Sequence, residues 1–282
     1  MNKKKQALLT ILDTKAIYPV FQPIVDLETC QVVAYESLSR IGNKELYMNI
    51  EELFKVAEAY GYVWKLEKLC RDKALETSVN KPLETKIFLN VDGQIFQDSN
   101  FISGFTNRKL EKFGLLNEDI VFEITERTDI ENYVLLQSIM NHYIDQGYQI
   151  ALDDVGAGYS GLNRVVNTTP NYLKADIELV RNIHLSKSKQ SMMKLLVNYC
   201  DEMGLKLIAE GIETQEELEC ICNLHVHYGQ GYYLGIPERK FNGVASQALE
   251  YLGLTSNLVT LLLFFFLSLT RITTRFSNPL SE

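Results

Sequence analysis

Short apolar runs recur along this chain, and several of them stop abruptly at a polar residue. Bounded by polar turns, such runs are typical of buried strands. A core strand seldom ends in a charged group, because a charge removed from water costs several kcal/mol unless it is paired or bound to a cation. Taken singly, each acid here could cap a following helix. The repetition instead predicts one metal site, built from Glu36, Asn90, Glu123, Asp153, Asp154, Lys174 and Glu210.

The spacing of apolar residues between these runs is helical. An antiparallel hairpin is expected over 18–25 and 31–38. Later strands are expected near 86–91, 119–124, 148–153, 171–176 and 205–210, and helices near 50–79, 98–112, 131–145, 187–203 and from about 214. Strands that alternate with helices form a parallel sheet. The pattern predicts a TIM-like (β/α)8 barrel with one antiparallel strand near the N-terminus, whose site lies at the C-terminal strand ends. A doubly wound open sheet is the alternative.

Length and composition favour one domain with a tail. No Gly/Ser/Pro-rich linker divides the 282 residues, so we expect an N-terminal helix or lead-in over 1–14, the barrel domain over 15–250 and a hydrophobic tail over 251–282. A net charge of -8 makes polymeric DNA or RNA a poor partner. Five irregularly spaced cysteines indicate a reducing compartment, and we expect a cytoplasmic protein.

The chemistry of the predicted site follows from its donor atoms. Carboxylates at close quarters raise one another's pKa unless cations intervene. Carboxylate and amide oxygens, without histidine or thiolate, select hard ions, so we expect two Mg²⁺ or Mn²⁺ ions. Adjacent aspartates such as Asp153 and Asp154 can serve two ions. Paired ions stabilise the attacking and leaving oxygens of a phosphoryl displacement, so phosphodiester hydrolysis is the predicted reaction.

Ordered motifs add a family resemblance to this reasoning. They are FQPIVD from Phe21, YESLSR from Tyr35, LNV from Leu89, EITE from Glu123, DDVGAGYS from Asp153, LKAD from Leu173, AEGIET from Ala209 and QGYYLG from Gln230. Over about residues 15–250 the chain resembles the EAL domain family, the phosphodiesterases that open cyclic di-GMP to the linear dinucleotide pGpG. The resemblance implies cyclic di-GMP as the ligand and a homodimer as the default assembly.

The resemblance also implies roles for individual residues. One ion is assigned to Glu36, Asn90, Glu123 and Asp153, and the second to Asp153 and Asp154 near Glu210. Lys174 would position or polarise water, and Gln230 would support it. Substrate contacts are assigned to Gln22, Leu38, Arg40 and Asp176, and support of the loop over 154–162 to Glu126 and Glu213.

Several residues depart from the family pattern without removing a ligand. Ser37 replaces the Ala of the family's signature, and the others are Val155, Ala157, Gly161 and Ala175. Because the set of acids is complete, catalysis is the expected function. Two alternatives stay open: a weakly active or inactive receptor that binds cyclic di-GMP, and a different two-metal phosphoesterase on the same barrel.

The tail is the most apolar stretch of the chain, and the resemblance does not account for it. Residues 258–269 would form a helix of about 18 Å, short of the roughly 30 Å hydrocarbon core of a bilayer. Three interpretations remain open: a buried final element or dimer contact, a C-terminal membrane anchor, and an artefact of the sequence. Membrane association through this tail is therefore an open expectation.

Overall fold

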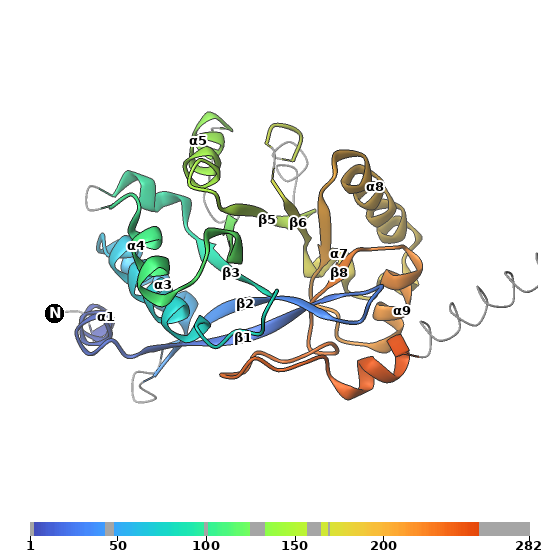
Figure 1. Ribbon diagram of the computed structural model, residues 1–282, viewed down its shortest axis with the longest axis horizontal. Helices are drawn as coiled ribbons and strands as arrows, with labels where there is room; N and C mark the ends of the chain where they lie inside the picture. The colour runs from blue at the N-terminus through green and yellow to red at the C-terminus, as the bar shows by residue number, and fades with distance from the viewer. Residues whose placement is uncertain are drawn as a thin grey trace, which may run out of the picture.

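Eight strands close into a barrel in chain order in the computed structural model, which describes residues 3–42, 48–98, 101–124, 133–156, 165–168 and 170–253 (Figure 1). The strands are β1 (Ile17–Asp26), β2 (Val32–Ile41), β3 (Lys86–Val91), β4 (Ile120–Ile124), β5 (Gln149–Val155), β6 (Tyr172–Ala175), β7 (Lys206–Ala209) and β8 (Tyr228–Gly229). β1 pairs antiparallel with β2 and with β8, and the remaining neighbours pair in parallel. The predicted barrel with an antiparallel N-terminal strand is confirmed, and closure excludes the open sheet.

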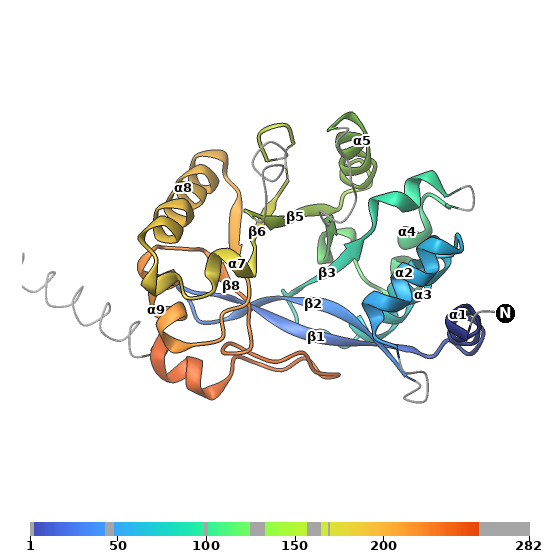
Figure 2. The same ribbon diagram turned by 180° about the vertical axis from the view of Figure 1, so that it is seen from behind.

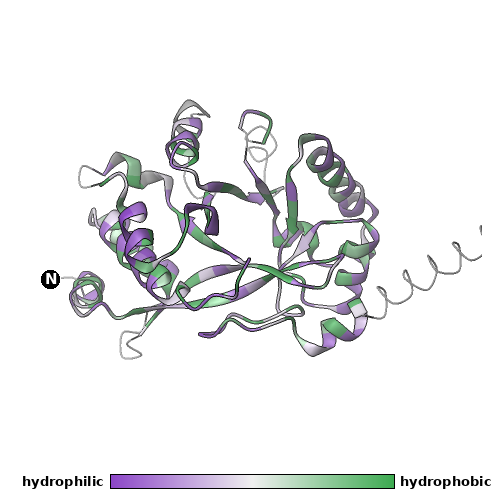
Figure 3. Ribbon diagram, viewed as in Figure 1, coloured by the Kyte–Doolittle hydropathy of each residue, from purple (hydrophilic) through white to green (hydrophobic). Residues whose placement is uncertain are grey.

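Helices surround this barrel. They are α1 (Lys3–Thr14), α2 (Ile50–Ala59), α3 (Val63–Ser78), α4 (Phe105–Phe113), α5 (Tyr133–Ile144), α7 (Ile177–Val180), α8 (Lys187–Met203) and α9 (Gln215–Asn223). Both ribbon views place α3 and α4 on the side of β3, and α8 and α9 on the side of β6 and β8 (Figures 1 and 2). Figure 2 shows α2 beside α3. The outer helices carry both hydrophobic and hydrophilic residues, as expected of helices with one buried face (Figure 3).

Two expected helices were wrong in detail. The helix expected over 50–79 is divided between α2 and α3, because the chain turns at Gly61, whose φ of +69° suits glycine. The helix expected from about 98 begins instead at Phe105, directly after Gly104, whose φ is +71°. Apolar spacing located these helices, but it did not locate the backbone turns that limit them.

The barrel interior contains an apolar plug, drawn from strands β1 to β7. Its members are Ile24, Ala34, Phe88, Val121, Ala151, Tyr172 and Ile208, and Tyr228 of β8 packs against them. Side chains alternate along a strand, so a residue two positions nearer the carboxyl-end mouth of the barrel points the same way. Those positions hold the polar residues described below. The plug is therefore the floor beneath the site.

A larger core lies between the strands and the helices. It includes residues from α1, such as Leu8 and Ile11, as well as Leu252 near the end of the described chain. No helix in the described ranges is long and apolar enough to cross a membrane. The apolar stretch over 258–269 lies outside the described residues, as do residues 157–162 of the loop expected over 154–162.

Candidate metal centre

One layer above the plug, every strand contributes a polar side chain at the same level of the barrel. Glu210 and Gln230 directly follow the last residues of β7 and β8, and the others lie within their strands. In strand order this layer consists of Gln22, Glu36, Asn90, Glu123, Asp153, Lys174, Glu210 and Gln230. Each is displaced by two positions from a plug residue, so its direction follows from strand alternation. The expected convergence of the strand-end residues is thus present.

The Lys174 ammonium lies at the centre of this layer. Its Nζ is 2.5 Å from Glu123 Oε1 and 2.7 Å from Glu210 Oε1. Glu36 Oε2 and Asp153 Oδ1 lie at 3.5 and 3.6 Å from the same nitrogen. Burial lowers the pKa of Lys174, but attraction to these acids outweighs it and raises the pKa well above its usual value. The side chain therefore remains charged although it is 1% exposed.

One ammonium does not balance the acids around it. Burial first, and then repulsion from Glu36, raise the pKa of Glu123, although Lys174 opposes both. The pKa of Glu210 is raised in the same way by burial and by Asp153. Glu123 Oε2 and Asp153 Oδ1 are buried oxygens that accept no hydrogen bond from the part of the chain that the structure describes. Such unsatisfied carboxylate oxygens fit additional cations.

The carboxylate oxygens form two groups of the size that an ion needs. Glu36, Glu123 and Glu210 each offer an oxygen within 4.8 Å of the others, and so do Asp153, Asp154 and Glu210. Glu210 belongs to both groups. Oxygen donors without nitrogen or sulfur are the set that Mg²⁺, Mn²⁺ and Ca²⁺ accept. The residues present therefore fit a pair of hard divalent cations that share an acid.

A β-bulge explains how two consecutive aspartates serve one site. In a regular strand Asp153 and Asp154 would face opposite sides of the sheet. The register between β5 and β6 shifts between Leu152 and Val155, and Asp154 has a left-handed φ of +56°. Burial, followed by repulsion from Asp153 and Asp176, raises the pKa of Asp154 to about 6. The inserted residue thus adds a second acid to the same side.

Amide side chains hold Glu36 from two directions. Gln230 Nε2 donates to Glu36 Oε2 at 2.6 Å and contacts Gln22 Oε1 at 3.2 Å. Gln22 Nε2 in turn donates to the Gly235 carbonyl at 3.2 Å. From the other side, Asn90 Nδ2 donates to Glu36 Oε1 at 3.1 Å. These hydrogen bonds from Gln230 and Asn90 fix the rotamer of Glu36.

The remaining predicted residues lie around this centre. Asp176 accepts a hydrogen bond from the Glu178 N–H as the cap of α7, and its carboxylate is one of the causes that raise the pKa of Asp154. Glu213 forms an exposed pair with Arg181, with oxygen–nitrogen distances of 2.6 and 2.8 Å. Glu126 lies outside the described residues.

Two predicted substrate residues continue outward along the same strand as Glu36. Leu38 and Arg40 follow it at two-residue intervals on β2, and Arg40 Nη1 donates to the Ser39 carbonyl at 3.0 Å. Sequence reasoning missed a neighbour of this region, Arg239, whose guanidinium carbon lies 3.8 Å from the centre of the Tyr18 ring. These two residues lie more than two hundred positions apart, and no local pattern connects them.

The barrel and its carboxylate layer define a class of TIM-like barrels with a cluster of oxygen ligands, suited to hard cations, at the carboxyl end. Comparison with known families is more specific. The EAL domain model matches residues 5–237, and the chain belongs to this family.

Curated relatives carry names that agree with this membership. The cyclic di-GMP phosphodiesterase PdeF of Escherichia coli is 30% identical over 244 residues, which cover 84% of this chain and 32% of PdeF. The first curated relatives are longer proteins, and the matches cover between 24% and 38% of their length.

Solved structures show the same fold. A standalone EAL protein of Vibrio cholerae, bound to cyclic di-GMP, is 27% identical with a TM-score of 0.70, covering 82% of this chain and 97% of that one. BlrP1 of Klebsiella pneumoniae, in complex with calcium and cyclic di-GMP, is 25% identical with a TM-score of 0.73, and the match covers 81% of this chain and 58% of the BlrP1 chain. A complex of BlrP1 with manganese and cyclic di-GMP is also similar, at 26% identity and a TM-score of 0.71, and the match covers 79% of this chain and 56% of the BlrP1 chain.

Proposed function

We propose that this chain hydrolyses cyclic di-GMP to linear pGpG with the aid of two divalent cations, Mg²⁺ or Mn²⁺. The observation that carries the proposal is the pair of acid groups that share Glu210, directly above an apolar floor. Membership of a family whose relatives include phosphodiesterases for this dinucleotide supplies the substrate. The complexes of BlrP1 with calcium and with manganese support hard cations as the cofactor.

Glu36, Asn90, Glu123 and Asp153 are the proposed ligands of one ion, and Asp153, Asp154 and Glu210 those of the other. When bound there, the ions supply positive charge for the phosphate and lower the pKa of a water molecule. The chain's own part is to hold the ligands at fixed positions above the plug. Exclusion of bulk water beneath the phosphate strengthens every electrostatic contact in this layer.

Lys174 and Gln230 are proposed to act on the attacking water. The Lys174 ammonium lies among the acids, where it donates a hydrogen bond to Glu123 and pairs with Glu210. It can orient a lone pair of the water and stabilise negative charge that develops on the phosphate oxygens. Gln230, held by Gln22 and Glu36, has a buried carbonyl oxygen with no hydrogen-bond partner among the described residues. That oxygen can accept a hydrogen bond from the water and so fix its direction.

Substrate binding is proposed for the wall of the site next to Glu36. Leu38 offers an apolar contact for a base, and the Arg40 guanidinium offers paired donors to a phosphate. Gln22 and Asp176 complete the proposed set. A homodimer and a cytoplasmic location stay predictions, and sedimentation velocity and cell fractionation would test them.

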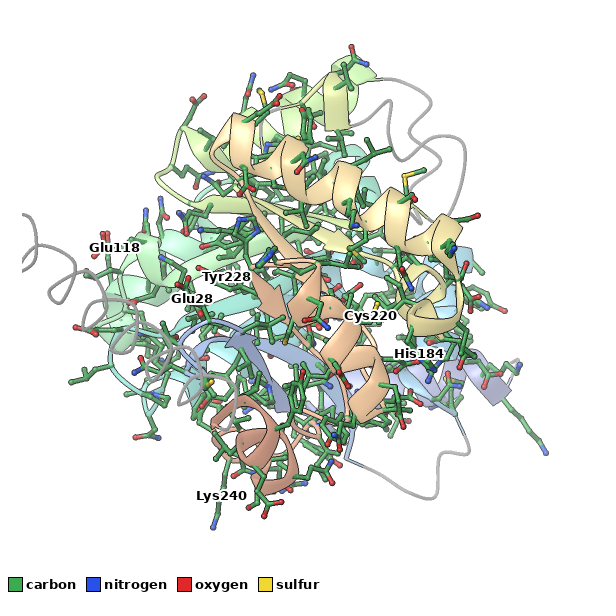
Figure 4. All side chains as sticks on the ribbon, turned by 90° about the vertical axis from the view of Figure 1, so that its right-hand side faces the viewer. Glu28, Glu118, His184, Cys220, Tyr228 and Lys240 are labelled. Carbon is green, nitrogen blue, oxygen red and sulfur yellow. The ribbon has the colours of Figure 1, made fainter. Side chains whose placement is uncertain are left out.

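Incubation of the purified protein with cyclic di-GMP and Mn²⁺ or Mg²⁺ tests the activity, with nucleotide products separated by chromatography. We expect linear pGpG, and its loss in Glu36→Gln, because the amide keeps the shape of the side chain and removes its charge. Glu28→Gln is the matched control. Glu28, which is labelled in Figure 4, is an exposed residue of the turn between β1 and β2. That turn precedes β2, whereas the site lies at the carboxyl end of β2, so Glu28 is at the opposite end of the barrel. Tight binding without turnover would instead establish a receptor, and turnover of other phosphodiesters alone would establish a different phosphoesterase.

A further inference from the structure

The β1–β2 hairpin extends beyond the rest of the barrel. β3 pairs with β2 over Ala34–Ser37, and β8 pairs with β1 at Val25 and Asp26. The paired residues 17–20 of β1 and 38–41 of β2 therefore continue past these neighbours on the carboxyl-end side. Figure 1 shows the two strands as a long ribbon that leads toward α1. The hairpin end is a wall beside the mouth of the site.

The face of this wall changes character with distance from the metal centre. Gln22 and Glu36 are register partners in the polar layer, and the partners two positions outward are the apolar Val20 and Leu38. Two positions further are Tyr18 and Arg40. A strand rises about 3.4 Å per residue, so these outer partners lie about 13 Å from the acid layer on the same face. Along this face the acid layer is thus followed by an apolar pair and then by an aromatic and cationic rim.

Arg239 completes this rim from a distant part of the chain. Its guanidinium carbon lies 3.8 Å from the centre of the Tyr18 ring, whereas the other cation–ring contacts of the described residues span 4.6 to 6.0 Å. A guanidinium plane stacked on an aromatic ring keeps its N–H donors at the edge of the stack. These donors remain available to a ligand, because Arg239 is exposed to solvent.

The segment that carries Arg239 is fixed to the hairpin. Phe21 N–H donates to the Glu238 carbonyl at 2.7 Å, and Glu238 N–H donates back at 3.1 Å. On the other side of Arg239, the Phe241 ring packs 4.2 Å from that of Phe21, centroid to centroid. The Tyr35 hydroxyl donates to the Asn242 carbonyl at 2.9 Å. Arg239 is therefore positioned before any ligand arrives, which reduces the entropy lost on binding.

We propose that Arg239, stacked on Tyr18, binds a guanine base of the half of cyclic di-GMP that is not cleaved. This inference rests on the proposed function and deepens it. The paired N–H donors of arginine match the O6 and N7 acceptors of guanine, whereas adenine presents an N6 donor in place of O6. Arg239 is then a specificity-determining residue for guanine. The distance of the rim from the acid layer suits the part of the ligand that extends away from the reacting phosphate.

The test separates binding from cleavage. Dissociation constants for cyclic di-GMP and cyclic di-AMP are measured by calorimetry in Ca²⁺, the ion present in one BlrP1 complex with cyclic di-GMP. Arg239→Ala should raise the Kd for cyclic di-GMP about tenfold or more and change that for cyclic di-AMP much less, so the preference for guanine falls. Arg239→Lys keeps the charge but not the fork, and should recover little. Lys240→Ala removes the neighbouring exposed charge and serves as the control.

Each outcome decides between the two proposals. An unchanged preference for guanine in Arg239→Ala, or full recovery in Arg239→Lys, overturns the role of Arg239 and leaves hydrolysis intact. Guanine-selective binding that depends on Arg239, without turnover in Mn²⁺ or Mg²⁺, supports the subsite and overturns the hydrolytic function. Absence of binding by the wild type overturns both. Thermal melting of each variant verifies that the exposed substitutions leave the fold unchanged.

Discussion

Lys174→Met is expected to strengthen divalent-cation binding while it abolishes hydrolysis. The ammonium lies within 3.6 Å of four carboxylates, those of Glu36, Glu123, Asp153 and Glu210, and each of them is a proposed ion ligand. Two unit charges 4 Å apart interact by about 4 kcal/mol at an effective dielectric constant of 20. A nearby dication would therefore be repelled by several kcal/mol. Allowing for relaxation and protonation of the acids, we expect about tenfold to hundredfold tighter binding.

The same substitution should destabilise the metal-free protein. Removal of one partner from a buried charge pair costs about 3–5 kcal/mol. Lys174 opposes the rise in the pKa of Glu123 and of Glu210, so its loss raises both values further. At a pH below those pKa values the acids are neutral, and the loss of stability is small. It should therefore grow as pH rises, and added Mn²⁺ should reverse it by binding the folded state.

Calorimetric titration with Mn²⁺ and thermal melting in EDTA at several pH values measure these effects. Lys187→Met is the matched control, because it removes the same charge from the exposed start of α8. Equal or weaker Mn²⁺ binding by Lys174→Met than by the wild type would refute the reasoning. It would mean that the ammonium supports the ions and does not compete with them for the acids.

Two further substitutions test the packing that supports the barrel. Arg71→Leu should destabilise by about 3–5 kcal/mol, because Glu67 would lose the partner it pairs with at 4% exposure or less. Burial raises the pKa of Glu67 to about 7 despite Arg71, so the loss of stability should be larger at pH 8 than at pH 5.5. Urea unfolding measures this loss. The double variant Arg71→Leu/Glu67→Leu should recover stability in the same assay. Gly231→Ala should destabilise by about 1–3 kcal/mol, since its Cβ would lie 2.1 Å from the Ile212 carbonyl oxygen. Gly243→Ala should not, because its Cβ would have no atom of a described residue within 4 Å, and equal thermal melting of the two variants would contradict the close approach.

The location of the site could be predicted because it depends on a local pattern. Residues such as Glu36 and Glu123 follow apolar runs, and closure of the barrel brings together the polar side chains at the ends of these runs. The two strands of the hairpin also lie close to the ranges expected for them, 18–25 and 31–38. Family motifs then separated ion ligands from residues such as Lys174, which strand position alone did not distinguish.

Features that depend on backbone geometry could not be predicted in the same way. Periodicity continued across Gly61, where the chain turns between two helices. It also gave no sign that Asp154 adopts a left-handed conformation within a strand. The stack of Arg239 on Tyr18 joins the two ends of the barrel sequence, and only the closed fold brings them together. In each case the deciding contact is tertiary.

The β-bulge at Asp154 has a consequence for how such sites arise. A regular β5 would present Asp153 alone, and the barrel would keep one complete acid group above the plug. The additional residue costs about 1–2 kcal/mol for a left-handed backbone, less for Asp than for a bulkier side chain. A barrel suited to a single ion and one suited to a pair can therefore differ by one codon inserted into one strand. No other strand has to move for the change in nuclearity.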